Sequence, residues 1–575
     1  MQQNINIMVG GEAGQGVQSV GFILCKALAR GGFHVFADQD YESRVRGGHN
    51  FFRIRAQDTE VGAISETLDM LLALDKESID LHQKELSKEG LIIFDDATVP
   101  DVKAGRGIFG LPLEKLAIEA GGNKVMANAV GLGALLGAAG YDFKLPEQAL
   151  IEHFDTKEVG EGNVKAARAG HDYIRKNYKG GFKKHLKKIS DGKRMLLNGN
   201  EAIALGAIAA GCKFMAAYPM TPASSIMEYL AAHGEEFGVT VVQAEDEIAA
   251  INMINGAGYT GVRAMTATSG GGFCLMVEGL GLAGITETPI VVVNAQRPGP
   301  AIGLPTRTEQ GDLEFMLYAS HGEFPRAVLA PGTVEECFHM TVKAFNLADE
   351  YQLPAIIITD QHLASSYATV DKFDLSSVTI DRGLMVPSDK AVKDYKRHAI
   401  TDSGISPRAF PGRKDLLVVT DSDEHDEAGH LIEDAGIRTN MMKKRMKKLQ
   451  GLKNEMPIPG TDGAKKTDNL IIGWGSTAGA IAEAAEMLKE AGHSVSTLFI
   501  NGIWPFPVQA VTKALKNAGQ SYVVENNATG QLAHLIRGET GISIDTKILK
   551  YNGRPFTPAE IVEKVKKEGL QHGNS

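Results

Sequence analysis

The stretch AAYPMTPASS, residues 216–225, decides the fold class of the region around it. It follows the apolar run CKFMAA and precedes a helical pattern, which is typical of a strand–turn–helix unit. Pro219 and Pro222 each fix their own backbone torsion and push the preceding residue towards an extended conformation. The turn is therefore stiff, and we expect it to present the hydroxyl of Thr221 at a cleft.

Strands and helices alternate on both sides of this turn. The pattern predicts helices over EAIALGAIAAG and EIAAINMINGAGYTG, and strands over VTVVQAEDE, RAMTATSGGG and PIVVVNAQR. The strands end in polar or glycine-rich loops, where open α/β sheets bind their ligands. Taken by itself, the turn has a second interpretation as a proline-initiated helix start that Ser224 or Ser225 caps.

The same alternation predicts an α/β protein with three parallel-sheet domains. A chain of 575 residues exceeds what one hydrophobic core usually supports. We assign domains to residues 1–180, 195–380 and 466–575, a linker to 181–194 and an irregular connection with one basic helix to 381–465. The lysine- and glycine-rich linker is most simply solvated and is not expected to bind a polyanion.

Composition and charge limit the partners and the compartment. The net charge of −10 argues against an extended nucleic-acid surface, and no apolar run reaches the length that spans a membrane. The start MQQNINIMVGG lacks the features of a secretory signal, so we expect a cytoplasmic protein. The scattered cysteines suggest neither a disulfide framework nor a metal site; they are Cys25, Cys212, Cys274 and Cys337.

Two motifs near the N-terminus are candidates for anion binding. GGEAGQG (10–16) follows a predicted strand and precedes a helix, where glycines bring backbone amides close to a phosphate; tight strand–helix packing explains them equally well. SRVRGGHNFFRIR (43–55) carries four arginines, which could hold a phosphate or form an intersubunit salt bridge. They are Arg44, Arg46, Arg53 and Arg55.

Glu247 is the most unusual acidic residue of the chain. It opens the predicted helix EIAAINMINGAGYTG, whose other side chains are small or apolar. A carboxyl group on such a face is poorly solvated and inclined to hold a proton. The alternative is a first-turn or capping acid, and Glu245 and Asp246 fit that alternative better.

Several motifs, taken together and in order, identify a family. YPMTPASS, EDEIAAINMINGAGYTG, TATSGGGF, NAQRPGPAIGLPTRTEQGDL and EHDEAGH resemble those of the alpha subunit of a 2-oxoacid:ferredoxin oxidoreductase. The chain is most similar to the 2-oxoglutarate type, in which a gamma region is fused ahead of the alpha region. Residues 5–178 resemble the gamma domain, 195–375 the pyrimidine-binding domain, and 466–575 a transketolase C-terminal-like domain.

The resemblance implies roles for residues of the YPMTPASS turn and of the Glu247 helix. Glu247 matches the glutamate that hydrogen-bonds the aminopyrimidine ring of thiamine diphosphate, and Thr221 matches the threonine that faces the 2-oxoacid. Tyr218 and Pro219 are expected to contact the cofactor with them.

The resemblance also implies a substrate pocket. Arg297 matches the arginine that binds the 2-oxoacid carboxylate, and Thr306 is expected to line the same pocket. Ala301–Ile302 stand where the family often has a Ser-Thr pair. Arg307 is the candidate for the distal carboxylate of 2-oxoglutarate; the alternatives are a surface salt bridge from Arg307 to Glu309 or Asp312, and a residue of a partner chain.

The motifs that the chain lacks imply a partner. There is no GDG…N diphosphate–magnesium motif and no cluster of four cysteines for a [4Fe–4S] centre. The resemblance assigns Mg²⁺ and the cluster to a beta subunit, with the active site between the chains and a dimer of alpha–beta heterodimers. The implied reaction converts 2-oxoglutarate, coenzyme A and ferredoxin to succinyl-CoA, CO₂ and reduced ferredoxin, or runs in reverse to fix CO₂.

Other interpretations remain open. Specificity for pyruvate, or for many 2-oxoacids, fits the same motifs. IIGWGST (471–477) and VVENN (523–527) resemble family loops near the subunit or coenzyme A region, or serve tight turns and a helix cap by Asn526. The chain could instead be a nucleotide-dependent oxidoreductase that uses GGEAGQG, or a non-catalytic assembly subunit that holds a partner through its arginines and its basic helix at 443–448.

Overall fold

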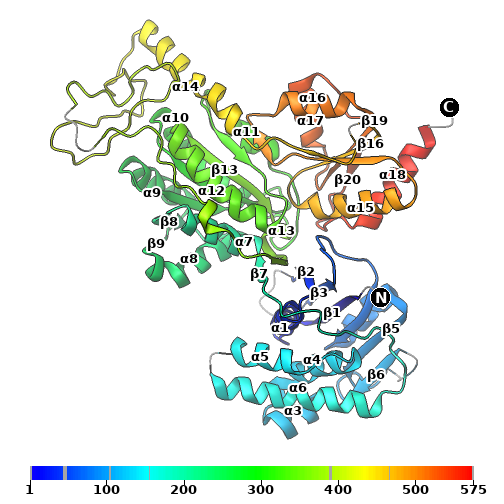
Figure 1. The fold of residues 1–575 in the computed structure, drawn as a ribbon. Coiled ribbons are helices and arrows are strands. Elements are labelled where there is room, and N and C mark those ends of the chain that lie inside the picture. Colours follow the sequence, from blue (N-terminus) through cyan, green and yellow to red (C-terminus); the bar gives the residue numbers. More distant parts are fainter. Residues whose placement is uncertain are drawn as a thin grey trace. The chain divides into compact units, whose positions relative to one another are not determined.

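The structure is a computed structural model that divides into two compact units. It describes residues 3–42, 48–102, 105, 107–154, 156–387, 392–464 and 466–572. The first unit comprises Met1–Asn198, Ser365–Phe373 and Thr557–Ala559, and the second comprises Gly199–Ala364, Asp374–Phe556 and Glu560–Ser575. Figure 1 labels the elements of both units.

The first unit is built on an eight-stranded mixed sheet. Its order is β6-β5-β4-β1-β3-β2-β14-β7. The strands are β1 (Asn4–Glu12), β2 (His34–Asp40), β3 (His49–Gln57), β4 (Leu68–Ala73), β5 (Leu86–Asp95), β6 (Ile108–Leu111), β7 (Met195–Asn198) and β14 (Tyr367–Val370). β1, β4, β5 and β6 are parallel, whereas β3, β2, β14 and β7 pair antiparallel.

The predicted parallel pairing is present among β1, β4, β5 and β6, whereas the other strands of this sheet depart from it. Only residues 41–48 join β2 to β3, and a connection of that length cannot make the crossover that parallel neighbours need. Figure 1 shows helices in cyan packed below the sheet. These are α3 (Leu113–Gly121), α4 (Ala127–Ala138), α5 (Lys144–His153) and α6 (Lys157–Asn177).

The predicted linker at 181–194 has no helix or strand, and most of its side chains are exposed. Phe182 and Leu186 are exceptions, because they lie in the hydrophobic core of the first unit. The segment thus packs along the first unit, and most of its lysine side chains are exposed to solvent.

The second unit contains a seven-stranded sheet with the order β18-β12-β13-β11-β10-β8-β9. The strands are β8 (Phe214–Ala217), β9 (Thr240–Gln243), β10 (Ala264–Thr268), β11 (Ile290–Gln296), β12 (Ala327–Leu329), β13 (Pro354–Asp360) and β18 (Gly502–Trp504). All pairs are parallel except β12–β18. The helices between them are α7 (Gly199–Ala209), α8 (Ser224–Phe237), α9 (Glu247–Tyr259), α10 (Gly270–Ile285), α11 (Leu313–Tyr318), α12 (Val334–Tyr351) and α13 (Gln361–Ser365).

A five-stranded sheet, β15-β17-β16-β19-β20, forms what we call the C-terminal domain of the second unit. Its elements are β15 (Thr461–Asp462), β16 (Thr467–Gly473), α15 (Ala478–Glu490), β17 (Val495–Phe499), α16 (Val508–Lys516), β19 (Ala518–Glu525), α17 (Gln531–Thr540), β20 (Thr546–Leu549) and α18 (Pro558–His572). The three predicted sheets are present, but the last two share one core, in which Val328 and Ile358 belong to the same cluster as Trp474 and Ile503.

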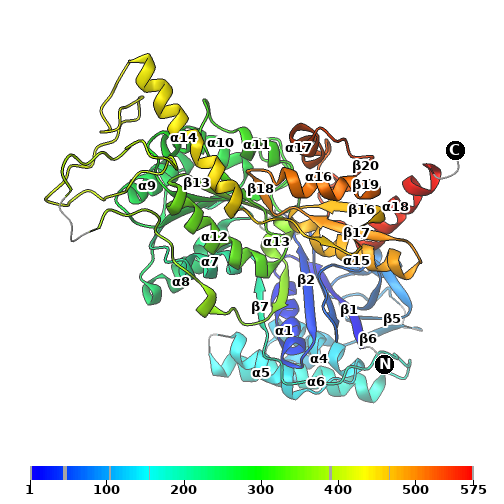
Figure 2. The ribbon, with the colours of Figure 1, turned by 45° about the horizontal axis from the view of Figure 1, so that its top comes forward.

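The connection at 381–465 contains the single predicted basic helix, α14 (Ala435–Glu455), drawn in yellow in Figure 2. Its central cations are buried. Lys444 and Lys448 form ion pairs with Glu287, and Arg445 Nη1 and Nη2 donate to Glu424 at 2.9 and 2.7 Å. The chain itself therefore uses Lys444, Arg445 and Lys448, and only Lys443 and Lys447 of residues 443–448 are exposed to a partner.

Candidate active site

The site lies where β8, β10 and β11 end, because neighbouring parallel strands bring their carboxyl ends to one edge. The YPMTP turn follows β8, and Arg297 follows β11 directly. Arg297 Nη1 donates to the carbonyl oxygen of Thr221 at 2.8 Å. The structure thus brings together two residues that the sequence places 76 positions apart.

The YPMTP turn is held from beneath by Asn200 of α7. The Asn200 Nδ2 group donates to Pro222 O at 2.7 Å and to Ser225 Oγ at 2.8 Å. Helix α8 begins at Ser224 without a side-chain cap, so the interpretation of the turn as a serine-capped helix start is wrong. Thr221 is half-buried at this edge, whereas Tyr218 and Pro219 are exposed.

Glu247 is buried at the start of α9, with 3% of its surface exposed. Asp246 is the cap, because its Oδ1 accepts from Ala249 N at 2.7 Å. Among the described residues, Glu247 Oε1 has no hydrogen-bond partner. Burial raises the pKa of Glu247, and the charge of Asp246 adds to this, while the Thr268 hydroxyl opposes it. A buried carboxyl atom without a partner is costly unless a ligand meets it.

The first turn of α10 faces Glu247 without any side chain. A Cβ atom on Gly272 would overlap the carboxyl of Glu247 and the hydroxyl of Thr268. At Gly271 the nearest atom to such a Cβ is Ala301 O, at 3.7 Å. Beside this bare turn, Ser269 Oγ is buried and has no partner among the described residues. The turn offers the backbone N–H groups of a helix start, with open space beside Gly271, a feature that the triple glycine could have revealed in the sequence.

Thr306 and Arg307 lie on the loop between Arg297 and α11. Thr306 is buried, and Arg307 Nη1 donates to Thr306 O at 3.2 Å and to Thr306 Oγ1 at 3.3 Å. Asp312 accepts a hydrogen bond from Asn294 Nδ2 at 3.0 Å and lies against Gly270. The two predicted substrate residues are therefore adjacent to each other at the same edge of the sheet as Arg297.

Glu309 gives this loop a pH dependence. Burial and then the charge of Asp312 raise the pKa of Glu309 to about 6. The folded chain favours the protonated acid, so stability is fully present below about pH 4.3 and falls as the pH rises to about 6. Glu309→Gln should remove this loss and raise the free energy of unfolding at pH 8 by about 1–2 kcal/mol in urea unfolding. The exposed Glu323→Gln is the control, and an unchanged pH slope in Glu309→Gln would contradict the assignment.

Two of the four arginines in the arginine-rich motif of the first unit make contacts within the fold. Arg53 Nε and Nη2 donate to the buried carboxylate of Asp38 at 3.0 and 2.7 Å, across the β2–β3 pair. Arg53 is therefore used within the chain, not by an intersubunit salt bridge. Arg55 Nη1 donates to Ala63 O. Arg44 and Arg46 lie outside the described residues.

The GGEAGQG motif begins inside β1 and ends at α1 (Val17–Arg30), as the sequence predicts. A Cβ atom on Gly10 would lie 2.8 Å from Ser78 Oγ, and one on Gly11 would lie 3.0 Å from Leu74 Cβ. Close packing therefore accounts for these two glycines.

EHDEAGH also lies away from the site. Glu424 accepts hydrogen bonds from Arg445, and the centroid of the His425 ring lies 4.1 Å from that of His398, with the ring planes tilted by 46°. His398 Nδ1 in turn lies 2.9 Å from Glu287 Oε1, beyond the C-terminal end of α10. The motif therefore fastens the 381–434 loops to the core.

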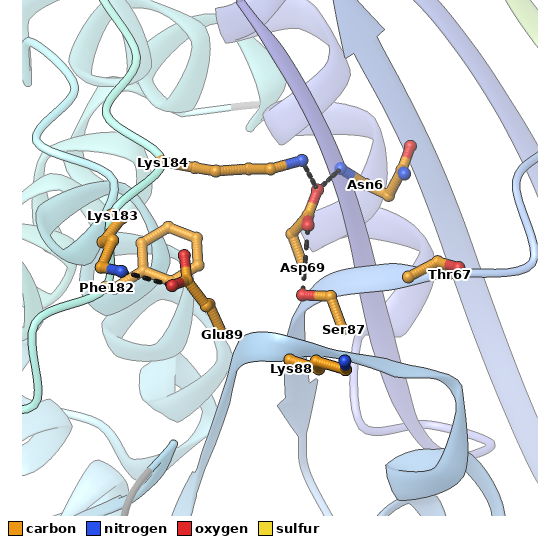
Figure 3. A pocket seen from close by; sticks show the side chains of 9 residues that line it. All are labelled: Asn6, Thr67, Asp69, Ser87, Lys88, Glu89, Phe182, Lys183 and Lys184. Atoms are coloured by element: carbon orange, nitrogen blue, oxygen red, sulfur yellow. Dashed lines mark hydrogen bonds and ion pairs between the residues drawn. The ribbon is translucent and has the colours of Figure 1, made fainter.

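A cavity of about 420 Å³ in the first unit lies at the amino ends of β1, β4 and β5, opposite the edge where α/β sheets bind ligands. Figure 3 shows the Lys184 ammonium group and the backbone N–H of Asn6 pointing to Asp69, and Lys183 pointing to Glu89. Four of its charged side chains therefore form two ion pairs, Lys184–Asp69 and Lys183–Glu89. Across the described ranges, no group of three or more His, Cys, Asp or Glu side chains is placed to hold a metal ion.

None of the helices in the described part of the chain is long and apolar enough to cross a bilayer.

A buried carboxyl group, a bare helix start and an arginine converge at the strand ends of a parallel sheet. This arrangement defines a cofactor-binding α/β enzyme chain.

Comparisons with known proteins give the family. Residues 205–444 match the family described as "Pyruvate flavodoxin/ferredoxin oxidoreductase, thiamine diP-bdg". Residues 6–173 match "Pyruvate ferredoxin/flavodoxin oxidoreductase", and residues 467–561 match "Pyruvate:ferredoxin oxidoreductase core domain II".

Relatives cover the whole length of the chain. The 2-oxoacid:ferredoxin oxidoreductase subunit alpha of Sulfolobus sp is 34% identical over 98% of this chain and 97% of its own. The 2-oxoglutarate synthase subunit KorA of Methanothermobacter thermautotrophicus is 34% identical over 64% of this chain and 98% of its own. A solved structure of 2-oxoglutarate:ferredoxin oxidoreductase from Magnetococcus marinus matches at 32% identity with a TM-score of 0.91, covering 98% of this chain and 99% of the other. The chain belongs to the family of 2-oxoacid:ferredoxin oxidoreductase alpha subunits, and the resemblance seen in the sequence is confirmed.

Proposed function

We propose that this chain is the alpha subunit of an enzyme that oxidatively decarboxylates 2-oxoglutarate to succinyl-CoA and CO₂ with reduction of ferredoxin, or runs the reverse carboxylation. The observation that carries the proposal is the buried carboxyl of Glu247 beside the bare first turn of α10, with an Oε1 atom that has no partner within the described part of the chain. The KorA relative and the Magnetococcus marinus structure, which has 2-oxoglutarate, coenzyme A and succinyl-CoA bound, support the substrate.

The residues around Glu247 fit the aminopyrimidine ring of thiamine diphosphate. When bound, this cofactor supplies the nucleophilic carbon for attack on a keto group. Burial raises the pKa of Glu247 and so favours its protonated form, in which Oε1 can donate a hydrogen bond to a ring nitrogen. Gly271 leaves open space beside this turn, and we assign Tyr218, Pro219 and Thr221, which follow β8, to contacts with the same ring.

Arg297 and Arg307 supply cations for a dicarboxylate. The guanidinium group of Arg297 uses Nη1 for Thr221 O and has other N–H donors, which suit the carboxylate beside the keto group. The Arg307 side chain stands beside Thr306 on the same loop and is assigned to the distal carboxylate.

Exposed apolar side chains beside the site support a partner chain. They follow closely on the site residues in α9, in α10 and in the loop after Arg297, and they are Ile248, Leu275, Ile302 and Leu304. Apolar groups that cluster around a site mark a surface that another chain covers. We assign Mg²⁺, the diphosphate site and a [4Fe–4S] cluster to this beta subunit, and we infer a dimer of alpha–beta heterodimers, in the cytoplasm, that reduces ferredoxin.

The proposal is tested by co-purification with the beta chain and a thiamine- and coenzyme-A-dependent dye-reduction assay over several 2-oxoacids. We expect activity with 2-oxoglutarate. In this complex, Arg307→Met should raise the KM for 2-oxoglutarate about 10- to 100-fold, because it removes a charged hydrogen bond to the distal carboxylate. The exposed Arg537→Met is the control.

Activity with pyruvate alone would refute the choice of 2-oxoglutarate. An equal loss with pyruvate and 2-oxoglutarate would refute the role of Arg307, because pyruvate has no distal carboxylate.

A further inference from the structure

The C-terminal domain grips the loop that carries Thr306 and Arg307. We call residues 297–312 the substrate segment. Gln310, near its end, is fully buried. Its Nε2 donates to Trp474 O at 2.8 Å, and its Oε1 accepts from Asn526 N at 2.9 Å. Its backbone N donates to Asn526 O at 2.7 Å, and its backbone O accepts from Asn527 Nδ2 at 3.1 Å. Both its amide and its backbone therefore bind the C-terminal domain.

These contacts explain two motifs that the sequence leaves open. Trp474 follows β16 and Asn526 follows β19, and these parallel strands are neighbours in the five-stranded sheet. A Cβ atom on Gly475, whose φ is 57°, would lie 2.8 Å from Gln310 Nε2. Gln310 of the substrate segment is therefore enclosed by residues of both motifs, which we call its socket: Trp474 and Gly475 of IIGWGST, and Asn526 and Asn527 of VVENN.

A second grip comes from Gln531, the first residue of α17. Its Nε2 donates to Gly311 O at 2.7 Å, and its Oε1 accepts from Glu314 N at 3.0 Å. On the other side, Thr308 Oγ1 donates to Asp360 Oδ1 at 3.0 Å, at the end of β13. Residues 308–314 are thus clamped between the two sheets of the second unit, while the tip at 301–304 is exposed.

We infer that Gln310 and Gln531 are positioning residues for the 2-oxoacid, and that the C-terminal domain sets the place of Arg307 and Thr306 through them. The inference rests on the proposed function. Glu247 belongs to α9, and none of the contacts described above joins it directly to Gln310 or Gln531. Loosening the clamp should therefore weaken 2-oxoacid binding and leave the affinity for thiamine diphosphate unchanged.

The test uses Gln531→Ala and Gln310→Glu in the complex with the beta chain. Gln531 is half-buried, so its variant should fold, and Gln310→Glu keeps the shape while losing the donor to Trp474 O. We expect the KM for 2-oxoglutarate to rise about tenfold in each, the loss that one buried hydrogen bond gives. The affinity for thiamine diphosphate should change less than about twofold. A general structural defect would instead weaken the binding of both the 2-oxoacid and thiamine diphosphate.

Hydrogen exchange of the amides at 299–307 is the second readout, measured in the chain by itself. It should quicken in both variants and stay unchanged in Arg537→Ala, an exposed change on the same helix. Unchanged KM and exchange, or a joint loss of 2-oxoacid and thiamine affinity, would overturn the inference. If the wild-type complex turned over no 2-oxoacid, the proposed function would fail, while unchanged exchange would still decide against the clamp.

Discussion

Glu247→Ala should lower the kcat of the reconstituted complex about 10²- to 10⁴-fold, the range that a positioned proton donor or acceptor contributes. Glu247 is the buried acid at the site, its pKa is raised by burial, and Oε1 has no partner among the described residues. In the proposed function, its removal takes away the group assigned to exchange a proton with the cofactor ring. The measurement is steady-state ferredoxin reduction at saturating 2-oxoglutarate, coenzyme A and thiamine diphosphate.

Glu245→Gln is the matched control for this prediction. Glu245 lies two positions earlier and is exposed, so the change removes a nearby carboxylate without touching the buried one. We expect its kcat to stay within about twofold of the wild type. If Glu247→Ala retained wild-type kcat, or lost no more activity than Glu245→Gln, the assigned role of Glu247 would be wrong.

Glu287→Gln should lower the free energy of unfolding by about 3–5 kcal/mol, the effect of breaking a buried ion pair. Glu287 is fully buried and pairs with Lys444 and Lys448 of α14, which are also buried. His398 Nδ1 lies 2.9 Å from the same carboxylate. Without the negative charge, two lysines remain in the core with no counter-ion. Urea unfolding of the purified chain measures the loss.

Lys444 and Lys448 also set the pH range over which Glu287 contributes to the stability of the fold. Although burial acts to raise it, the pKa of Glu287 lies well below its usual value because Lys444 and Lys448 hold the charged form. The stability from Glu287 is therefore present above the unfolded pKa, about 4.3, and is lost as the pH falls through the lower folded pKa.

Glu455→Gln is the control for the cluster. Glu455 is the last residue of α14 and forms a partly exposed ion pair with Lys343 of α12, so the variant should lose at most about 1 kcal/mol of unfolding free energy. Adding Lys444→Met to Glu287→Gln should recover stability, because it removes one of the uncompensated charges. A loss in Glu287→Gln no larger than in Glu455→Gln would show that the cluster contributes little.

The sequence predicts the fold class and the local surroundings of two site residues. The apolar helix after Glu247 and the stiff turn at Thr221 are local patterns, and each marks a strand end where parallel sheets gather ligands. Their structural consequences, the burial of Glu247 and the capping role of Asp246, are both observed. The roles of these residues stay predictions.

Pairings over long distances could not be predicted. In the sequence, the basic stretch of α14 indicates a surface that could hold a partner, because its counter-charge Glu287 lies 157 residues before Lys444. Composition and periodicity register only neighbours, so a buried cation and an exposed one look the same in sequence. The socket for Gln310 was missed for a similar reason, since its amide partners are backbone groups 164 and 216 positions away.

The measurement that tests the account most directly is the exchange of the acidic ring proton of thiamine diphosphate for deuterium, followed by NMR after rapid quenching of the reconstituted complex. The account predicts fast exchange in the wild type and in Glu245→Gln, and exchange slowed about 10²-fold or more in Glu247→Ala at equal cofactor occupancy. Equal exchange rates in the wild type and Glu247→Ala, with the cofactor bound in both, would contradict it.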